Sequence, residues 1–508
     1  MQNSDKNTVL LKHRKLPGWL SSLCRGKDHD PTEYETITWL FLRLLGCIYL
    51  AAFISFGIQA PGLIGTDGIL PLIQHQEFLY LIPGLQVQLK IPNIFWLSGS
   101  DVFLQMVCLT GAIFSILIII NVLLRTSLVI LYLLYLSLFE AGQIFMAYQW
   151  DLLLLEAGFL AIFLPTQSIV IIWLYRWLVF RFMLLGGLVK ILSHDPSWGN
   201  LTALTYYFET QPLPTPLAWY AHHLPDWMLL TGTATTLIVE LMIPFFILLP
   251  RRFRMFAAGC FIILQSLIML TGNHNFLNLL TISLCLFLFD DSAIKKILPT
   301  FFRRIPSTTI SNAVQPKWLK VGLAGLAIVI LTISSSQLWR LCKGSDLPVA
   351  ASLAKVFEPM RIVNAYGLYS IITTSRHEIV IEGSNDQNTW VEYAFKYKPG
   401  NLKSKPVWTI LHQPRLDWQM WFAALSDRDH NPWFGNLLYR ILQGNKAVND
   451  LFESNPFPDT PPGYIRAVIY DYHFSRSKLK DDRGQWWTRN RKRVYQPITY
   501  LSHNNQIE

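Results

Sequence analysis

The chain has 508 residues, of which 52% are hydrophobic, and its mean hydropathy is +0.31. This apolar content excludes an ordinary soluble protein and indicates an integral membrane protein. The formal net charge is +10, but the cations lie mostly at the ends of apolar segments, which favours topology signals over nucleic-acid binding. The six cysteines stand singly, without CxxC or metal-type spacing, so we expect no metal site, and the sequence requires no cofactor.

The first 37 residues are polar and basic and contain no signal-peptide pattern. We therefore expect residues 1–37 to be a cytoplasmic segment and the first apolar run to act as signal and anchor. Apolar runs of about 20 residues can each cross a bilayer. They predict nine spans within a helical membrane domain at 38–340: 38–57, 102–124, 127–148, 152–174, 177–192, 227–249, 253–271, 276–289 and 318–338.

The distribution of basic residues orients these spans. Segments on the inner side contain Arg125, the pair Arg176 and Arg181, the cluster around Arg251, and basic residues from Lys295 onward. The segments expected outside are nearly free of cations, as the positive-inside rule requires. Nine spans with an inner amino terminus predict that the tail, residues 341–508, is a folded domain on the non-cytoplasmic side.

Between the fifth and sixth spans lies a long external loop, 191–226, rich in aromatic residues. Pro212, Pro214 and Pro216 forbid a continuous helix there and predict an extended stretch. Such a loop lies in the headgroup zone more often than it forms a lid over a site, and both readings remain open.

The tail mixes strand and helix patterns. HEIVIEGSNDQNTWVEYAFKY predicts strands at 377–381 and 390–396 around a turn, and RAVIYDYHF alternates again. LDWQMWFAAL and GNLLYRILQG have helical spacing, and the stripe of Trp418, Trp421 and Phe422 is more typical of a core than of a binding face. The predicted fold is a polytopic α-helical membrane bundle with a C-terminal α+β, sheet-containing extramembrane domain.

Four ionisable residues interrupt the apolar spans: Glu140, Glu156, Lys190 and Glu240. Ionisable groups inside a membrane are costly and indicate a functional site by default, so these four are the catalytic candidates. We expect Glu140, Glu156 and Lys190 in the outer half of the membrane, beneath the loop. Lys190 has three possible roles: snorkelling to the interface, pairing with a buried carboxylate, or acting as a base.

Several long phrases of the chain resemble the lipase maturation factor family. They are LTALTYYFETQPLPTPLAWYAHHLP, RRFRMFAAGCFIILQSLIMLTGNHNFLNLLT, EIVIEGSND, HQPRLDWQMWFAAL, NPWF, NPFP and YIRAVIYDYHF, and the likeness runs from roughly Tyr148 to Leu501. The resemblance implies a membrane-embedded protein that assists folding or maturation of secreted or exported clients, with a client lipase or other exported protein and membrane lipid as partners. Animal members sit in the endoplasmic reticulum membrane and assist folding and dimer assembly of secreted lipases.

The loop and tail phrases also supply candidate binding residues. These are Trp198, Glu209, Thr210, Gln211, Pro212, Trp219, Tyr220, His222, Asn275, Gln413, Arg415, Asp417, Trp418 and Trp421.

A second likeness supports an alternative function. GGLVKILSHDPSW resembles the membrane segment of the vitamin K-dependent gamma-carboxylase that carries its catalytic lysine, which would correspond to Lys190. The alternative is a membrane enzyme, carboxylase-like in architecture, that acts on a lipophilic substrate in an outward-facing intramembrane pocket. The chain lacks a match to the large lumenal part of that enzyme, so its activity is not carried over.

The ending HNNQIE is no reticulum retention signal, and the tail has almost no cysteine. We therefore favour a bacterial inner membrane with a periplasmic tail, with the reticulum membrane and a lumenal tail as the alternative.

Overall fold

The computed structural model describes residues 34–81, 92–297, 316–345, 347–476, 480 and 482–502. The predicted cytoplasmic segment 1–37, apart from its last four residues, lies outside these ranges, as do Arg303 and Arg304. The membrane part comprises α2 (Glu35–Ile64), α3 (Leu72–Tyr80), η1 (Ile94–Trp96), α5 (Asp101–Ile119), α6 (Leu124–Ala141), η2 (Gln143–Phe145), α7 (Gln149–Ala161), η3 (Leu164–Thr166), α8 (Ile169–Leu192), α9 (Pro196–Gly199), α10 (Ala203–Thr210), α11 (Pro216–His222), α12 (Asp226–Leu241), η4 (Ile243–Leu248), α13 (Arg251–Thr271), α14 (Leu277–Leu284), η5 (Cys285–Leu288), α15 (Asp291–Ile297) and α16 (Lys317–Lys343).

Eight helical stretches among the described residues are long and apolar enough to cross a membrane, and a shorter apolar helix spans Leu277–Leu288. The polytopic helical architecture is thus confirmed, and the short helix corresponds to the predicted eighth span. Close helix packing uses small residues: a Cβ added to Gly111 of α5 would lie 2.3 Å from the ring of Phe53 on α2.

The boundary between the fourth and fifth spans was predicted too late in the chain. The chain turns at Gln167, whose φ is 54°, and α8 begins at Ile169 rather than near residue 177. Arg176 and Arg181, expected at the inner end of the predicted span 177–192, therefore lie well within α8 and are buried. The helix tolerates them because each guanidinium finds acceptors on neighbouring segments: Arg176 donates to the Phe287 carbonyl at 2.9 Å, and Arg181 pairs with Glu156.

The tail contains a four-stranded antiparallel sheet in the order β2-β1-β5-β6 and a small β3-β4 sheet. Helix α18 packs on β1 and α19 on β5, so helices cover one part of the sheet. The tail elements are α17 (Pro348–Phe357), η8 (Glu358–Met360), β1 (Arg376–Ser384), β2 (Val391–Glu392), β3 (Ala394–Phe395), α18 (Arg415–Ala424), η9 (Arg428–His430), α19 (Pro432–Leu442), α20 (Lys446–Asn449), β4 (Phe452–Ser454), β5 (Tyr464–Phe474) and β6 (Trp487–Thr499).

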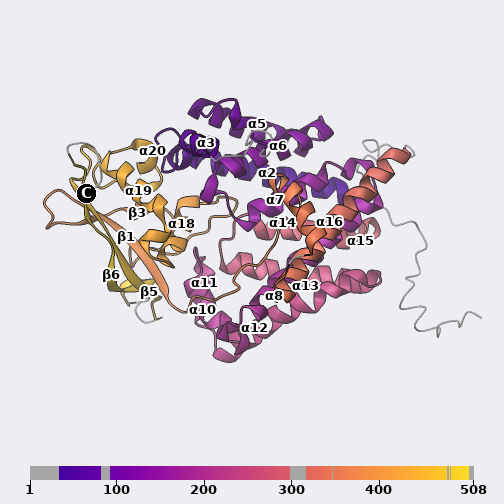
Figure 1. Ribbon diagram of the computed structural model, residues 1–508. Helices are drawn as coiled ribbons and strands as arrows, with labels where there is room; N and C mark the ends of the chain where they lie inside the picture. The colour runs from indigo at the N-terminus through magenta and orange to yellow at the C-terminus, as the bar shows by residue number, and fades with distance from the viewer. Residues whose placement is uncertain are drawn as a thin grey trace, which may run out of the picture.

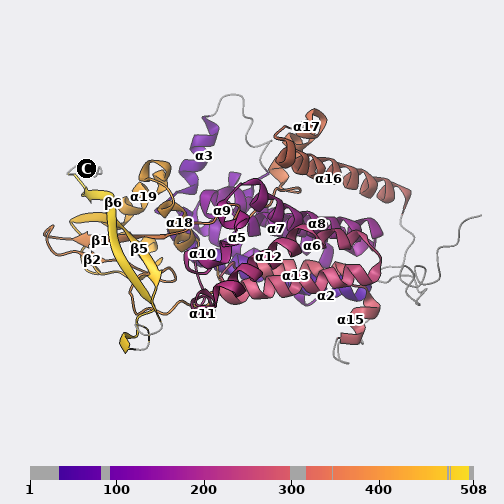
Figure 2. The ribbon, with the colours of Figure 1, turned by 90° about the horizontal axis from the view of Figure 1, so that it is seen from below.

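The sheet-containing tail is confirmed, including its predicted strands and helices. The predicted strand at 390–396 is divided into β2 and β3, and the edge strand β6 was not predicted. Figures 1 and 2 show the long helices bundled together, with the sheet at one end beyond α10 and α11. We call this end of the bundle the tail-side end.

The 191–226 loop lies at the tail-side end. It folds into the short helices α9, α10 and α11, with an extended stretch between the last two. Within that stretch Pro214 forms a bridge with Gly272, and Pro216 begins α11, where a proline is tolerated because the missing N–H has no partner to lose.

Candidate functional site

A cavity of about 110 Å³ lies at the tail-side end, where α8, α12, α13 and α14 meet the loop and the segment 366–369. Trp198, Leu204 and Tyr207 enter it from the loop, so loop residues form part of its wall. The 366–369 segment, which leads into the tail, forms another part. Membrane helices, the loop and the segment leading into the tail therefore all contribute to the wall of one cavity.

Lys190 and Glu240 form an ion pair in the cavity wall. Lys190 is in the last turn of α8, and Glu240 is near the end of α12. The Lys190 Nζ contacts Glu240 Oε2, and the ring of Trp198 lies 5.1 Å from the same ammonium. Both side chains are buried, so each charge is stabilised by the other instead of by water. Of the three roles considered for Lys190, the structure places it in the paired arrangement.

The two helices approach closely because α8 carries glycines beside the pair. A Cβ added to Gly187 would lie 2.8 Å from the Leu241 side chain, too close for an ordinary contact. A Cβ added to Gly186 would lie 3.8 Å from the Glu240 carboxylate, which is ordinary van der Waals contact. Gly186 lines the cavity, so this position leaves open space beside the carboxylate.

The imidazole of His274 lies close to two tyrosine hydroxyls in the cavity wall. Its Nε2 lies 2.7 Å from the Tyr369 hydroxyl and 3.3 Å from the Tyr207 hydroxyl. His274 follows α13 and precedes α14, and burial lowers its pKa to about 4, so its imidazole is neutral at pH 7. Trp198 donates its indole N–H to the Tyr369 carbonyl at 3.0 Å, which ties the loop to the 366–369 segment.

Two amides lie on the floor of the cavity. Asn278 donates from Nδ2 to Gln265 Oε1 at 2.7 Å, while Asn278 Oδ1 is buried without a partner among the described residues. Gln265 Nε2 reaches only the sulfur of Met183, at 3.9 Å. Sulfur is a weak acceptor, so the floor offers one unused acceptor and one poorly used donor.

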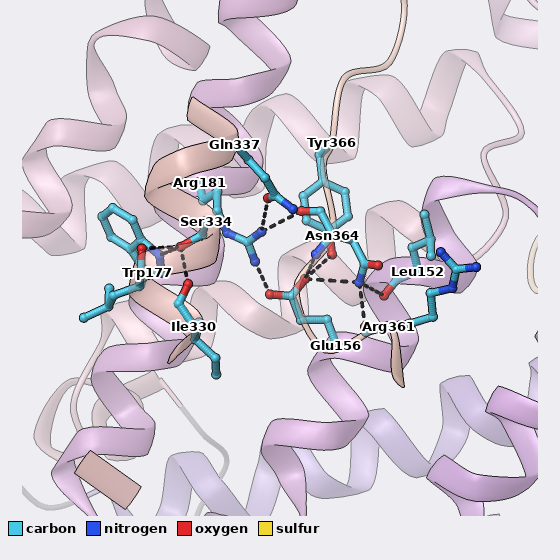
Figure 3. A network of polar contacts seen from close by, with 11 residues as sticks. Leu152, Glu156, Trp177, Arg181, Ile330, Ser334, Gln337, Arg361, Asn364 and Tyr366 are labelled. Carbon is cyan, nitrogen blue, oxygen red and sulfur yellow. Dashed lines mark hydrogen bonds and ion pairs between the residues drawn. The ribbon is translucent and has the colours of Figure 1, made fainter. Parts of the chain in front are cut away.

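Glu156 belongs to a different network, shown in Figure 3. Its carboxylate, on α7, pairs with Arg181 of α8 and accepts from the Asn364 N–H at 3.1 Å and the Tyr366 hydroxyl at 2.7 Å. Arg181 also donates to the Asn364 carbonyl at 2.6 Å. The segment that leads into the tail is therefore fixed to two membrane helices by a buried carboxylate.

Glu140 has a third, separate partner. It lies near the end of α6 and accepts from Arg361 at 3.3 Å. The four candidate charges therefore do not line one pocket: Glu140 and Glu156 hold the 361–366 segment, and of the four only Lys190 and Glu240 line the cavity.

A buried ion pair of Arg415 with Asp151 links the tail to the membrane part. Two guanidinium nitrogens of Arg415 each lie 2.9 Å from a carboxylate oxygen of Asp151, and the Phe145 carbonyl accepts at 2.6 Å. The Tyr135 hydroxyl donates to the same carboxylate. Sequence reasoning missed Asp151 because it sits one residue before the predicted span 152–174, where an acidic residue looks like an ordinary boundary.

The proline stretch of the loop is held by a second buried arginine. Arg376, at the start of β1, donates to the backbone carbonyls of Glu209, Gln211 and Pro212. Sequence reasoning did not single out Arg376, because one arginine at the start of a strand looks like a surface residue.

The remaining loop candidates face the tail. Glu209 lies 3.2 Å from His222 and 2.7 Å from His473. The Thr210 carbonyl accepts from the Trp421 indole at 2.8 Å, Trp219 donates to the Ser475 carbonyl at 3.0 Å, and Tyr220 accepts from Lys480 at 2.9 Å.

The tail candidates lie along the same junction. Gln413 makes backbone hydrogen bonds with Ser55 and Gln59 of α2, and Trp418 packs 4.8 Å from the Trp150 ring. Asp417 accepts from two backbone N–H groups, and burial raises its pKa to about 6. Asn275 is buried in the turn between α13 and α14 with a φ of 56°.

Of the predicted binding residues only Trp198 lines the cavity. The stripe of aromatic residues on α18 is divided, because Trp418 is buried while Phe422 is exposed.

Comparison with known proteins gives the same two-part division. Residues 36–296 match the family described as "Lipase maturation factor transmembrane domain", and residues 362–497 match the family described as "Lipase maturation factor C-terminal domain". Lipase maturation factor 2 of Xenopus tropicalis is 34% identical, covering 91% of this chain and 82% of that protein. Lipase maturation factor 1 of Mus musculus is also 34% identical, covering 95% of this chain and 91% of the relative. No solved structure matches. With both parts matched and relatives aligned over most of their length, this chain belongs to the lipase maturation factor family.

Proposed function

We propose that this protein assists the folding or maturation of exported proteins, with a lipase as one class of client. The observation that carries the proposal is the 34% identity to proteins named lipase maturation factor 1 and 2, which extends over both the membrane part and the tail. An activity inherited from such relatives would use both parts together.

The architecture suits such a role because the tail is held rigidly against the membrane part. Buried ion pairs at Arg415 and Glu156 join the tail and the segment leading into it to the helices, so the tail surface keeps a fixed position relative to the membrane. A client that emerges from the membrane would meet this surface before it meets solvent.

One segment of the tail presents apolar side chains to solvent. In the 407–411 segment all four large apolar residues are exposed: Val407, Trp408, Ile410 and Leu411. Asn273, just after α13, holds this segment through the Val407 carbonyl and the Thr409 N–H, at 2.7 and 3.0 Å. Exposed apolar groups beside the membrane suit contact with unfolded chains, and we assign client contact to the 407–411 segment.

The enzymatic alternative depends on a free base at Lys190. The Lys190 ammonium instead forms an ion pair with Glu240 and lies over the ring of Trp198. A general base must present a free lone pair to its substrate, whereas the Lys190 Nζ is engaged in these two contacts. The pairing therefore favours the maturation role over the membrane enzyme.

We also propose that the tail lies on the non-cytoplasmic side, in a periplasm if the source is bacterial and in the reticulum lumen otherwise. A reporter that is active only outside the cytoplasm, fused after Leu341, should be active, and the same reporter fused at Lys295 should be silent. The opposite pattern would reverse the topology.

The maturation role is tested by removing the protein and measuring an exported lipase encoded in the same genome. We expect the secreted lipase to lose activity and protease resistance, while its messenger and total synthesis stay unchanged. Ile410→Asp should reproduce part of that loss, whereas the control Ile498→Asp, also at an exposed isoleucine of the tail, should restore wild-type maturation. Unchanged folding of exported lipases after deletion would refute the proposal.

A further inference from the structure

The cavity beside Lys190 combines an apolar wall with a polar end. Phe182, Met183, Ile268 and Leu277 supply ring, thioether and aliphatic surface. The volume of about 110 Å³ is many times the roughly 10–15 Å³ that one water requires. Its lining resembles that of ligand sites in proteins, where a few placed polar groups in a mostly apolar wall fix the orientation of the ligand.

The charges of the cavity cancel. Among the described residues that line it, only Lys190 and Glu240 carry full charges, and they contact each other. His274 is neutral at pH 7. A ligand with a net charge would therefore be buried without a counter-charge, which is costly, and a neutral polar group is the better match.

The floor of the cavity specifies the kind of neutral group. Asn278 Oδ1 is a buried acceptor without a partner, and Gln265 Nε2 donates only to the Met183 sulfur. Leaving such buried groups unsatisfied costs free energy that a ligand can recover. A hydroxyl can donate to the asparagine and accept from the glutamine at once, whereas a carbonyl only accepts and an ammonium only donates.

We propose that this cavity binds a neutral amphiphile whose polar end carries hydroxyl groups, of which a monoacylglycerol is the simplest lipid example. One hydroxyl lies between Asn278 and Gln265, and the acyl chain follows the wall formed by Phe182 and Met183. The phenols of Tyr207 and Tyr369 supply donors and acceptors for a second hydroxyl. The position of the cavity among the ends of membrane helices favours a ligand drawn from the lipid phase. This site is independent of the proposed maturation role.

The test uses the full-length protein in phosphatidylcholine nanodiscs and a monoacylglycerol with a photoreactive diazirine in its acyl chain. After illumination, labelled peptides are mapped by mass spectrometry. We expect labels on α8, α13 and α14. Gly186→Leu fills the cavity and should reduce labelling at least about tenfold, equivalent to losing roughly 1.4 kcal/mol of binding.

Gly259→Leu is the matched control, because a Cβ there meets nothing within 4 Å and Gly259 does not line the cavity. It should leave labelling unchanged. Gly186→Ala, which the spacing to Glu240 accommodates, serves if Gly186→Leu fails to fold, and it should reduce labelling partially. Unchanged labelling in Gly186→Ala and Gly186→Leu would place the probe elsewhere and overturn the proposal.

Competition defines the chemistry of the head group. Excess unlabelled monoacylglycerol should abolish labelling, whereas a fatty acid, which is anionic, and lysophosphatidylcholine, which is zwitterionic, should compete poorly. Asn278→Leu should weaken binding about three- to tenfold, the effect of losing one hydrogen bond, with its melting temperature measured alongside. Equal competition by all three lipids would overturn the neutral head group, and no labelling of folded wild-type protein would mean that the cavity holds only water.

Discussion

Two buried ion pairs of this protein differ in what surrounds them. At the junction of tail and membrane part, Arg415 is held by both carboxylate oxygens of Asp151 and by a backbone carbonyl, and aromatic rings enclose it. At the cavity, Lys190 contacts one oxygen of Glu240 and both residues border open space. A charge that is buried away from any such space and paired through both carboxylate oxygens joins two segments, whereas a charge pair beside a cavity with unused polar groups leaves room for a ligand.

Breaking the junction pair should have the largest effect. Asp151→Asn keeps the side-chain shape but leaves the Arg415 guanidinium without a counter-charge in a dry site. We expect a loss of about 3–5 kcal/mol of unfolding free energy, measured by equilibrium unfolding in mixed micelles. The double variant Asp151→Leu with Arg415→Met removes both charges and should recover much of that loss. If Asp151→Asn leaves the unfolding free energy unchanged, this ion pair does not hold the tail against the membrane part.

Breaking the cavity pair should cost less. Lys190→Met leaves Glu240 uncompensated, but the adjacent space admits water and the carboxyl can take up a proton. We expect a loss of about 1–3 kcal/mol in the same unfolding assay. A loss as large as that of Asp151→Asn would show that the two sites are equally dry and would remove the contrast between them.

Acidification should act on both regions. Burial lowers the pKa of His274 at the cavity and of His412 at the junction to about 4, whereas an unfolded histidine titrates near 6.5. The unfolded chain therefore takes up protons first, and stability should fall as the pH falls from 6.5 to 4. Asp417, whose pKa is raised to about 6, opposes this trend because its folded form takes up a proton first.

Melting temperatures measured between pH 4.5 and 7 test whether stability falls as the pH falls. His412→Gln should flatten the pH dependence, and Asp417→Asn should steepen it. A steeper curve in His412→Gln would contradict the assignment of His412 as a neutral buried group.

An exposed pair provides the smallest expected effect. Arg493 and Asp427 are 2.8 Å apart, but both side chains are largely exposed to solvent. Arg493→Met should change the unfolding free energy by no more than about 1 kcal/mol, because water and salt screen such pairs. A larger change would mean that β6 and the α18–α19 connection are coupled by more than this contact.

Sequence patterns predicted the elements whose signals are local. Apolar runs identified the helices, and alternation of residue types identified β1 and β5, although β1 is buried on both faces. The strand β6 was missed because its TRNRKR run is polar on both faces, as expected of a solvent-exposed edge strand.

The site was predicted only in part, because its partners are distant in the chain. Lys190 and Glu240 stood out as isolated charges in apolar helices, yet their contact joins residues that are fifty positions apart. Arg181 was taken for a cation at the inner end of a span because no local signal reveals its contacts with Glu156 and Asn364. The Asn278 side-chain oxygen lacks a hydrogen-bond partner within the described part of the chain because of how the surrounding helices pack. The presence of an asparagine in an apolar helix does not by itself predict this.

The contacts of Arg376 set an order of events during synthesis. The loop carbonyls that Arg376 holds belong to residues 209, 211 and 212, which leave the ribosome more than 160 positions earlier. The tail-side end of the bundle therefore stays incomplete until the first strand of the tail has been made, and the segment 366–369 that walls the cavity arrives only just before it. During that interval the cavity lacks part of its wall, and a cavity that is lined as in the folded protein exists only once the tail has begun to form.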